Sequence, residues 1–164
     1  LKAKEEQRKK PSPPTVTGGG NMLYLDTSAF LKLYIREEGS EWVQHHIMEQ
    51  EDPLPIWEIQ ECEFTNALHL KGFWKELSRG QIKQQLDLFH SRKRRGVYEF
   101  QDLDRSALME RFRDLTTHTM KMGCRTLDIL HVACALEIGA QTFLSFDQRQ
   151  LRLAKKVGLK TATP

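Results

Sequence analysis

Cysteine is scarce in this chain, and its few cysteines form no recognisable pattern. Cys62, Cys124 and Cys134 are the only three in 164 residues, and no two of them make a CxxC pair. An odd number of widely spaced thiols does not fit a disulfide framework or a cysteine-based zinc site. We therefore expect reduced thiols and a cytoplasmic protein.

Long apolar runs are also missing. No run approaches the roughly 20 residues that a helix needs to cross a bilayer, and no signal-peptide pattern of charged then apolar residues opens the chain. Hydrophobic residues make up 39% and charged residues 29%, which is typical of a globular protein. The length is that of one ordinary domain with its own core. We expect no membrane partner.

An excess of positive charge is absent from most of the chain. The net charge is +3, but residues 1–21 hold five basic and two acidic side chains, which account for all of it. Subtracting these from the totals of 25 and 22 leaves 20 of each in residues 22–164, so net charge gives no argument for nucleic acid. Residues 1–21 are rich in lysine, proline and glycine, which predicts a flexible linker or appended tail before one domain over 22–164.

Short apolar segments alternate with segments of helical periodicity. This alternation predicts an α/β domain in three layers, with helices on both faces of a central parallel sheet of four or five strands. We expect Ser40, Ser78 and Thr126 to cap helices. The expected strands are 22–25, 54–56, 97–100, 142–145 and 159–162, and the expected helices are 27–36, 40–50, 58–77, 79–95, 106–122, 126–138 and 148–157.

Four acidic residues stand at positions where such a fold binds ligands, which is outside the carboxyl ends of its strands. Asp26 directly follows the first strand, and Asp147 follows the strand that begins at residue 142. Asp128 lies in the first turn of its helix, where the helix dipole favours a carboxylate. Glu63 lies on the helix of residues 58–77.

Several carboxylates that converge would repel one another unless a cation lies between them. Mg²⁺ and Mn²⁺ prefer oxygen ligands of this kind, and two such ions can promote phosphodiester hydrolysis. Each acid also has a structural interpretation when it is taken alone. Asp26 and Asp147 could cap helices, Asp128 could interact only with its helix dipole, and Glu63 could be a solvated surface charge.

The sequences around these acids resemble the motifs of a known family. Residues 23–34 (LYLDTSAFLKLY) closely resemble the opening motif of PIN domains, and residues 63–68 (EFTNAL) resemble their second motif. Residues 125–133 (RTLDILHVA) and 143–149 (FLSFDQR) resemble the third and the fourth. All four occur in the family's order, and the resemblance is greatest to VapC-like toxins of type II toxin–antitoxin pairs.

This resemblance implies a parallel sheet between helical layers, Mg²⁺ or Mn²⁺ as the cofactor, and endonucleolytic cleavage of RNA. It makes Asp26, Asp128 and Asp147 the candidate metal ligands, with Glu63 completing the site directly or through water. It also implies a cognate antitoxin and a homodimer as partners. The small polar side chains expected beside the acids are Ser28, Asn66 and Ser145.

Three other features have alternative interpretations. His131 is expected to be a buried, hydrogen-bonded structural residue, since metal-activated water does not require it as a base. The aromatic residues Trp57, Phe73, Trp74 and Phe89 could form a dimer or antitoxin surface, or lie in the core. The candidate RNA contacts are Arg92 and Arg94 at one helix end, and Arg149, Arg152 and Lys155 on the last helix.

Basic residues of this kind hold phosphates without reading sequence, but Arg92 and Arg94 could equally stabilise a helix C-terminus. The last helix is favoured because Asp147 opens it. Two other functions stay open at this point. One is a PIN nuclease for housekeeping RNA processing, without an antitoxin. The other is a non-catalytic module that binds RNA or protein.

Overall fold

The computed structural model describes residues 22–50 and 52–164, which form five strands and eight helices. The expected linker of residues 1–21 lies outside the described residues. No helix in the described ranges is long and apolar enough to cross a membrane.

All five strands are short and pair in parallel. β1 (Leu23–Leu25), β4 (Thr142–Leu144) and β5 (Lys160–Ala162) form one sheet in the order β1-β4-β5. β2 (Leu54–Ile56) and β3 (Tyr98–Phe100) form a second pair, and β2 contacts β1. The five strands thus occur at the five predicted places, and the α/β class with parallel strands is confirmed.

The expected single sheet is divided in its hydrogen bonding between β1 and β2. Leu54 donates its N–H to Val97 and Ile56 accepts from Gln101, so the backbone groups of these two residues face β3. The backbone of Pro55 between them therefore faces away from β3. Because proline has no N–H, it cannot donate a hydrogen bond to a neighbouring strand.

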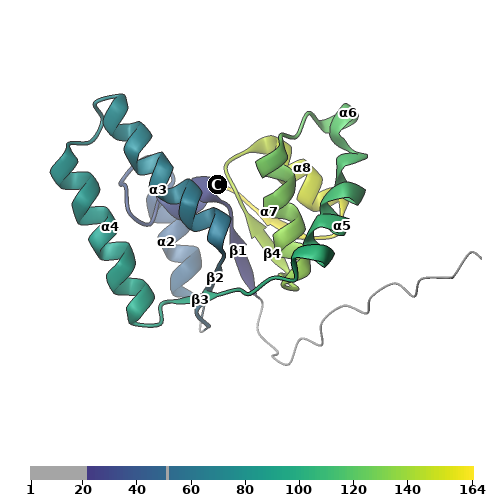
Figure 1. The fold of residues 1–164 in the computed structure, drawn as a ribbon, viewed down its shortest axis with the longest axis horizontal. Coiled ribbons are helices and arrows are strands. Elements are labelled where there is room, and N and C mark those ends of the chain that lie inside the picture. The colour runs from purple at the N-terminus through teal and green to yellow at the C-terminus, as the bar shows by residue number, and fades with distance from the viewer. Residues whose placement is uncertain (1–21, 51) are drawn as a thin grey trace, which may run out of the picture.

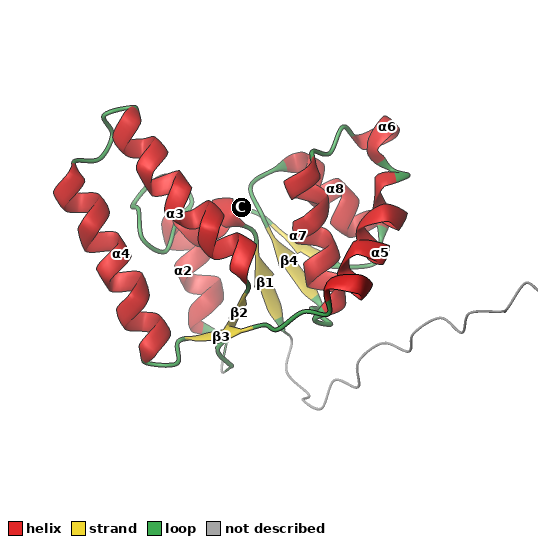
Figure 2. Ribbon diagram, viewed as in Figure 1, coloured by secondary structure: helices red, strands yellow, loops and turns green. Residues whose placement is uncertain are grey.

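The helices form two groups, one on each side of the β1-β4-β5 sheet (Figures 1 and 2). Contacts join α1 to α3, α3 to α4, α5 to α7, and α7 to α8. The bounds of the helices are α1 (Thr27–Leu31), α2 (Ser40–Met48), α3 (Glu58–Phe73), α4 (Arg79–Arg94), α5 (Arg105–Thr116), α6 (Thr119–Met122), α7 (Thr126–Glu137) and α8 (Gln148–Lys156).

Each face of the sheet is covered by its own hydrophobic core. Tyr24 and Phe143 are buried in the core beneath α5, α7 and α8. Leu23, Leu25 and Leu144 belong to the core on the other side, beneath α1, α3 and α4. Neighbouring residues of a strand point to opposite faces of the sheet. Apolar residues at successive positions therefore bury both faces beneath helices, which gives the predicted three layers.

Several predicted helix boundaries are wrong. The helix of 27–36 ends at Leu31, and the helix of 58–77 ends at Phe73, shortly before Lys75, which has a left-handed φ of 62°. The helix of 106–122 is divided into α5 and α6. At the division, the hydroxyls of Thr116 and Thr117 donate to carbonyls three residues earlier, which competes with helical hydrogen bonding.

The predicted caps are correct in one of three cases. Ser78 caps α4 and forms a capping box with Gln81. Ser40 and Thr126 are instead the first residues of α2 and α7. The residue before Ser40 is Gly39, with φ of 85°, and a Cβ there would lie 2.6 Å from Cε1 of Phe146, so glycine lets this turn approach the loop after β4.

Candidate active site

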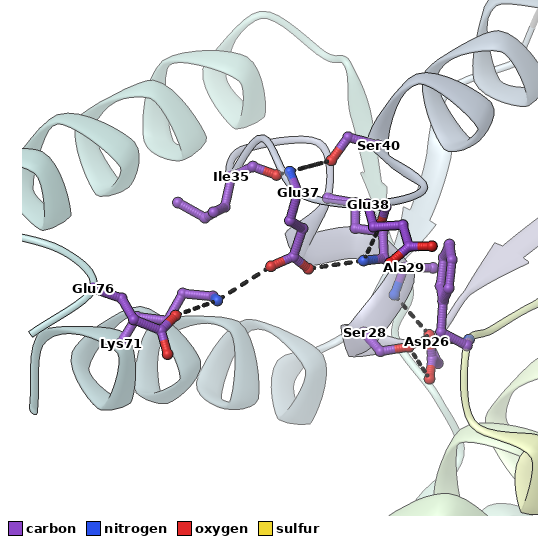
Figure 3. Close-up of polar contacts among 11 residues, drawn as sticks. Asp26, Ser28, Ala29, Ile35, Glu37, Glu38, Ser40, Lys71 and Glu76 are labelled. Carbon is purple, nitrogen blue, oxygen red and sulfur yellow. Dashed lines mark hydrogen bonds and ion pairs between the residues drawn. The ribbon is translucent and has the colours of Figure 1, made fainter. Parts of the chain in front are cut away.

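Asp26 lies at the carboxyl end of β1, and its side chain is almost completely buried. Oδ1 accepts hydrogen bonds from the N–H of Ala29 and the hydroxyl of Ser28, both at 2.8 Å (Figure 3). Oδ2 accepts from the hydroxyl of Ser145 at 2.8 Å. Burial raises the pKa of Asp26, while His131 and these hydrogen bonds lower it by less. Charge on this carboxylate therefore costs free energy unless a cation compensates it.

Asp147 is the N-cap of α8. Its Oδ1 accepts from the N–H groups of Arg149 at 2.7 Å and Gln150 at 3.4 Å. The N–H of Asp147 donates to Oγ of Ser145 at 2.9 Å, and the same hydroxyl donates to Asp26. One serine thus joins the two aspartates, although 121 positions separate them in the sequence.

Asp128 is buried in the first turn of α7. Its Oδ2 accepts from the N–H of Arg125 at 2.7 Å, and its Oδ1 accepts from Nε2 of Gln150 at 3.2 Å. Because Gln150 also contacts Asp147 through its backbone, it links these two acids. Asp26, Asp128 and Asp147 therefore belong to one hydrogen-bonded chain.

Glu63 lies on α3 and is partly buried. Its Oε2 accepts from the hydroxyl of Thr27 at 2.8 Å and contacts Nε2 of His131 at 2.5 Å. Burial raises the pKa of Glu63, but the hydrogen bonds and charge of its partners lower it by more, so that its pKa is lowered overall. Both contacts fall on Oε2, and Thr27 directly follows Asp26, which brings Glu63 to the same edge.

His131 holds Glu63 from inside the core. Its Nδ1 lies 2.8 Å from the hydroxyl of Tyr24, which accepts from Nε1 of Trp57 at 2.9 Å. Tryptophan can only donate, so the Tyr24 hydroxyl accepts from Trp57, and His131 pairs with Tyr24 through Nδ1 and with Glu63 through Nε2. The structure shows the buried, hydrogen-bonded histidine that the sequence predicted, and adds that its partner is an acid of the site.

Replacing His131 by leucine tests this contact. We expect His131→Leu to lower the free energy of unfolding by about 2–3 kcal/mol, because Tyr24 and Glu63 each lose a partner at a buried position. His69 is exposed on the same helix as Glu63, and His69→Leu should change stability by less than about 0.5 kcal/mol. Urea unfolding of both variants measures the difference, and equal stabilities would contradict a buried role for His131.

A loop on the other side of the site is held by a network of ion pairs. Nζ of Lys32 donates to Glu37 at 2.9 Å and lies 4.3 Å from the ring centre of Phe146, next to Asp147. Lys71 bridges Glu37 at 3.2 Å and Glu76 at 2.9 Å (Figure 3). Burial raises the pKa of Glu37, but its bonds to the two lysines lower it further, so the net shift is downward.

The smaller polar candidates differ in their positions. Ser28 and Ser145 both donate to Asp26, as expected for residues beside the acids. Asn66 is exposed on α3 and makes no hydrogen bond to the four acids within the described ranges. Gln150 is the site residue that the sequence analysis missed, because a glutamine within a helical stretch carries no distinctive signal.

The basic candidates are partly engaged with the protein. Arg92 lies over the ring of Tyr34 at 4.9 Å and donates to the carbonyl of Leu33 at 3.3 Å. Arg149 and Arg152 reach the carbonyls at the end of α6, at 3.4 and 3.5 Å. Lys155 and Arg94 are exposed, and contact with RNA stays a prediction for all five.

The four aromatic residues are divided between core and surface. Trp57 and Phe89 are buried. Phe73 and Trp74, at the end of α3, are 78% and 58% exposed. Only this second pair can contribute to a surface for a partner.

The donor chemistry at this edge fits a hard divalent cation, since carboxylate oxygens are its preferred ligands. Among the described residues, Oε1 of Gln150 beside these acids is buried and accepts no hydrogen bond. However, in the part of the chain that the structure describes, no three histidine, cysteine, aspartate or glutamate side chains are arranged so that they could hold a metal ion. The acids are instead connected through protein donors, Ser145 between Asp26 and Asp147 and Gln150 between Asp147 and Asp128.

Comparison with known proteins places these residues in a family. The PIN domain model matches residues 23–156. Ribonuclease VapC46 of Mycobacterium tuberculosis is 26% identical over 144 residues, which cover 87% of this chain and 97% of that protein. Two solved structures share the fold. VapC20 of Mycobacterium tuberculosis, titled a sarcin-ricin loop cleaving toxin, has a TM-score of 0.63, 12% identity, and coverage of 87% and 99%. VapBC2 of Rickettsia felis, bound to a DNA fragment from its promoter, has a TM-score of 0.60 and 19% identity. The match covers 86% of this chain and 98% of that one.

Proposed function

Because the chain belongs to the PIN-domain family, we propose that it is a divalent-cation-dependent endoribonuclease and the toxin of a type II toxin–antitoxin pair. The observation that carries the proposal is the hydrogen-bonded chain that links Asp26, Asp128 and Asp147 at one edge of the sheet. Two similar proteins, VapC46 and VapC20, are named as a ribonuclease and as a sarcin-ricin loop cleaving toxin. Their names support the choice of RNA as substrate.

The roles of the residues follow from their contacts. Asp26, Asp128 and Asp147 would hold Mg²⁺ or Mn²⁺, with Glu63 bound directly or through water. The cation would supply positive charge to the phosphate and lower the pKa of a water molecule. Ser28 and Ser145 fix the orientation of the Asp26 carboxylate.

Thr27 and His131 occupy Oε2 of Glu63, and no hydrogen bond within the described ranges engages its Oε1. This oxygen is therefore available to ligands at the sheet edge. Glu63 would contribute it to the cation or to a water held there. The lowered pKa of Glu63 keeps the group ionised at neutral pH.

The proposed partners are RNA, a cognate antitoxin and a second copy of the chain, in the cytoplasm. Phe73 and Trp74 offer exposed apolar area for a protein partner. Lys155 and Arg94 offer exposed positive charge for phosphates. The buried, unpaired Cys124 and Cys134 suit a reducing compartment.

Removal of the cation tests the proposal. We expect the purified protein to cut a pool of structured RNAs in Mg²⁺ or Mn²⁺, and to lose at least ~10³-fold in rate in EDTA, because the cation contributes several kcal/mol to the transition state. Excess Mn²⁺ should restore the rate, and circular dichroism should show that the chelated protein is still folded. Equal cutting in EDTA would contradict the mechanism, and binding of RNA without cutting would favour a non-catalytic module.

A further inference from the structure

Gln150 is a buried polar residue to which neither the sequence motifs nor the proposed function assigns a role in binding ligands. It is the third residue of α8, and only 6% of its surface is exposed. The helix presents apolar residues to the core at neighbouring positions, among them Leu151, Leu153 and Ala154. A long amide side chain at such a position loses rotamer freedom and hydration, so its hydrogen bonds should explain it.

The orientation of the amide follows from its partner. Asp128 can only accept when it is ionised, so the group 3.2 Å from its Oδ1 must be the NH₂ of Gln150. The reverse orientation would place two acceptors against each other. Oε1 therefore points away from Asp128 within the same planar amide, and none of the described residues donates a hydrogen bond to it.

An unpartnered buried oxygen costs about 1–3 kcal/mol. Gln60 and Gln85 also have a buried Oε1 without a partner, but Gln60 donates to the carbonyl of Leu25 and not to a carboxylate. Gln150 differs because its side chain contacts one acid of the site and its backbone N–H contacts another, Asp147. Gln150 therefore lies beside two of the residues that would bind the cation.

The choice of glutamine also has an electrostatic reason. A glutamate at this position would add a negative charge beside Asp128, and a lysine or arginine would neutralise the acids in place of a cation. An amide supplies a donor and an acceptor without changing the charge. It suits a position that must orient a carboxylate and leave its charge available.

We infer that Gln150 is a positioning residue of the site, which holds Asp128 through Nε2 and offers Oε1 to an O–H donor brought by the bound ligands. That donor is either a water of the divalent cation or a ribose hydroxyl of the RNA, since both present the same chemistry. The inference rests on the proposed function. Outer partners of metal ligands typically contribute ~10–100-fold to metal affinity or activity.

Binding of Mn²⁺ alone, followed by electron paramagnetic resonance, is the first readout. We expect Gln150→Met to weaken Mn²⁺ binding by at least ~10-fold. Gln85→Met is the matched control, because it removes an amide with an equally unpartnered oxygen from α4. It should leave Mn²⁺ binding unchanged. Wild-type Mn²⁺ affinity and wild-type RNA cleavage in Gln150→Met would overturn the inference.

The RNA arm distinguishes the two donors. If Gln150→Met binds Mn²⁺ normally but cuts RNA at least ~10-fold more slowly at saturating Mn²⁺, the donor is the ribose hydroxyl. If only the inference about Gln150 is wrong, the wild-type protein still binds Mn²⁺ and cuts RNA, and Gln150→Met does both equally well. If the wild-type protein neither binds Mn²⁺ nor cuts RNA, the proposed function itself has failed.

Gln150→Glu keeps the size of the side chain and provides a second test if the methionine variant does not fold. The new carboxylate repels Asp128, so the cation-free variant should melt at a lower temperature than the wild type. Mn²⁺ should then raise its melting temperature by more than that of the wild type, because the cation relieves the repulsion. Equal increases would overturn the placement of Gln150 beside the cation.

Discussion

We expect Asp26→Asn to reduce the rate of RNA cleavage by at least ~10³-fold. This reduction corresponds to a loss of about 4 kcal/mol of transition-state stabilisation. Asparagine keeps the shape of the side chain and an oxygen for the N–H of Ala29. It removes the negative charge at the most buried of the four acids. Single-turnover cleavage of structured RNA at saturating Mn²⁺ measures the rate.

The control for this variant is Asp102→Asn. Asp102 is exposed in the loop before α5, and no hydrogen bond or ion pair within the described ranges joins it to the four acids, so its variant should cut RNA at the wild-type rate. Cleavage by Asp26→Asn at the wild-type rate would point to a contaminating nuclease and would reject the assignment of the site.

Asp26→Asn should be more stable than the wild type at neutral pH in the absence of a cation, although it cuts RNA more slowly. Burial raises the pKa of Asp26, so the folded state holds this proton more tightly than the unfolded chain, whose aspartate pKa is about 3.9. The stabilisation from Asp26 is therefore complete below that pH and is lost as pH rises through the folded-state pKa. In EDTA, the wild type should lose stability relative to Asp26→Asn as the pH rises above about 4, as measured by thermal unfolding. A constant difference would contradict the raised pKa.

Truncation of Phe64 has the largest expected effect on stability. Its side chain is completely buried, and its ring centre lies 4.7 Å from that of Tyr34, 5.2 Å from Phe89 and 5.3 Å from Phe30. Phe64→Ala should lower the free energy of unfolding by about 3–5 kcal/mol, and the melting temperature by roughly 10 °C or more in a domain of this size. Urea unfolding and calorimetry provide the two measurements.

One further variant on the same helix separates the effect of burial from that of losing an aromatic ring. Phe73→Ala removes an aromatic residue that is exposed on the same helix, and it should change stability by less than about 0.5 kcal/mol. If Phe64→Ala costs no more than Phe73→Ala, the aromatic cluster does not stabilise α3. Because Glu63 precedes Phe64, the folded fraction of Phe64→Ala should also lose RNA cleavage as the helix loosens.

The strand positions could be predicted because local apolar runs and turn residues define them. The same holds for the acids at strand ends, since Asp26 and Asp147 each cap the helix that follows and contact N–H groups two or three residues later. The structural interpretation of these two residues as caps is therefore correct as well. It does not exclude a role in binding, because capping uses only Oδ1 of each carboxylate, and Oδ2 of Asp26 accepts from the hydroxyls of Ser28 and Ser145.

Helix ends were less predictable. Apolar periodicity continues through residues 32–36 and 117–122, but the chain leaves the helix where side chains offer the backbone other partners. Lys32 binds the carbonyl of Glu38, and Thr117 binds the carbonyl of Asp114. The contact of Lys32 depends on how the surrounding chain folds, and the contact of Thr117 depends on the geometry of its own hydroxyl.

The sequence by itself determined the class of fold and the order of its elements, because these depend on contacts between near neighbours, and its resemblance to the PIN motifs singled out the four acids. Only the tertiary structure decided which side chains hold those acids. His131 reaches Glu63 across 68 positions and Ser145 reaches Asp26 across 119, and Gln150 reaches Asp128 from the next helix. Such pairs form when two elements pack face to face, and the periodicity of either element does not specify its partner.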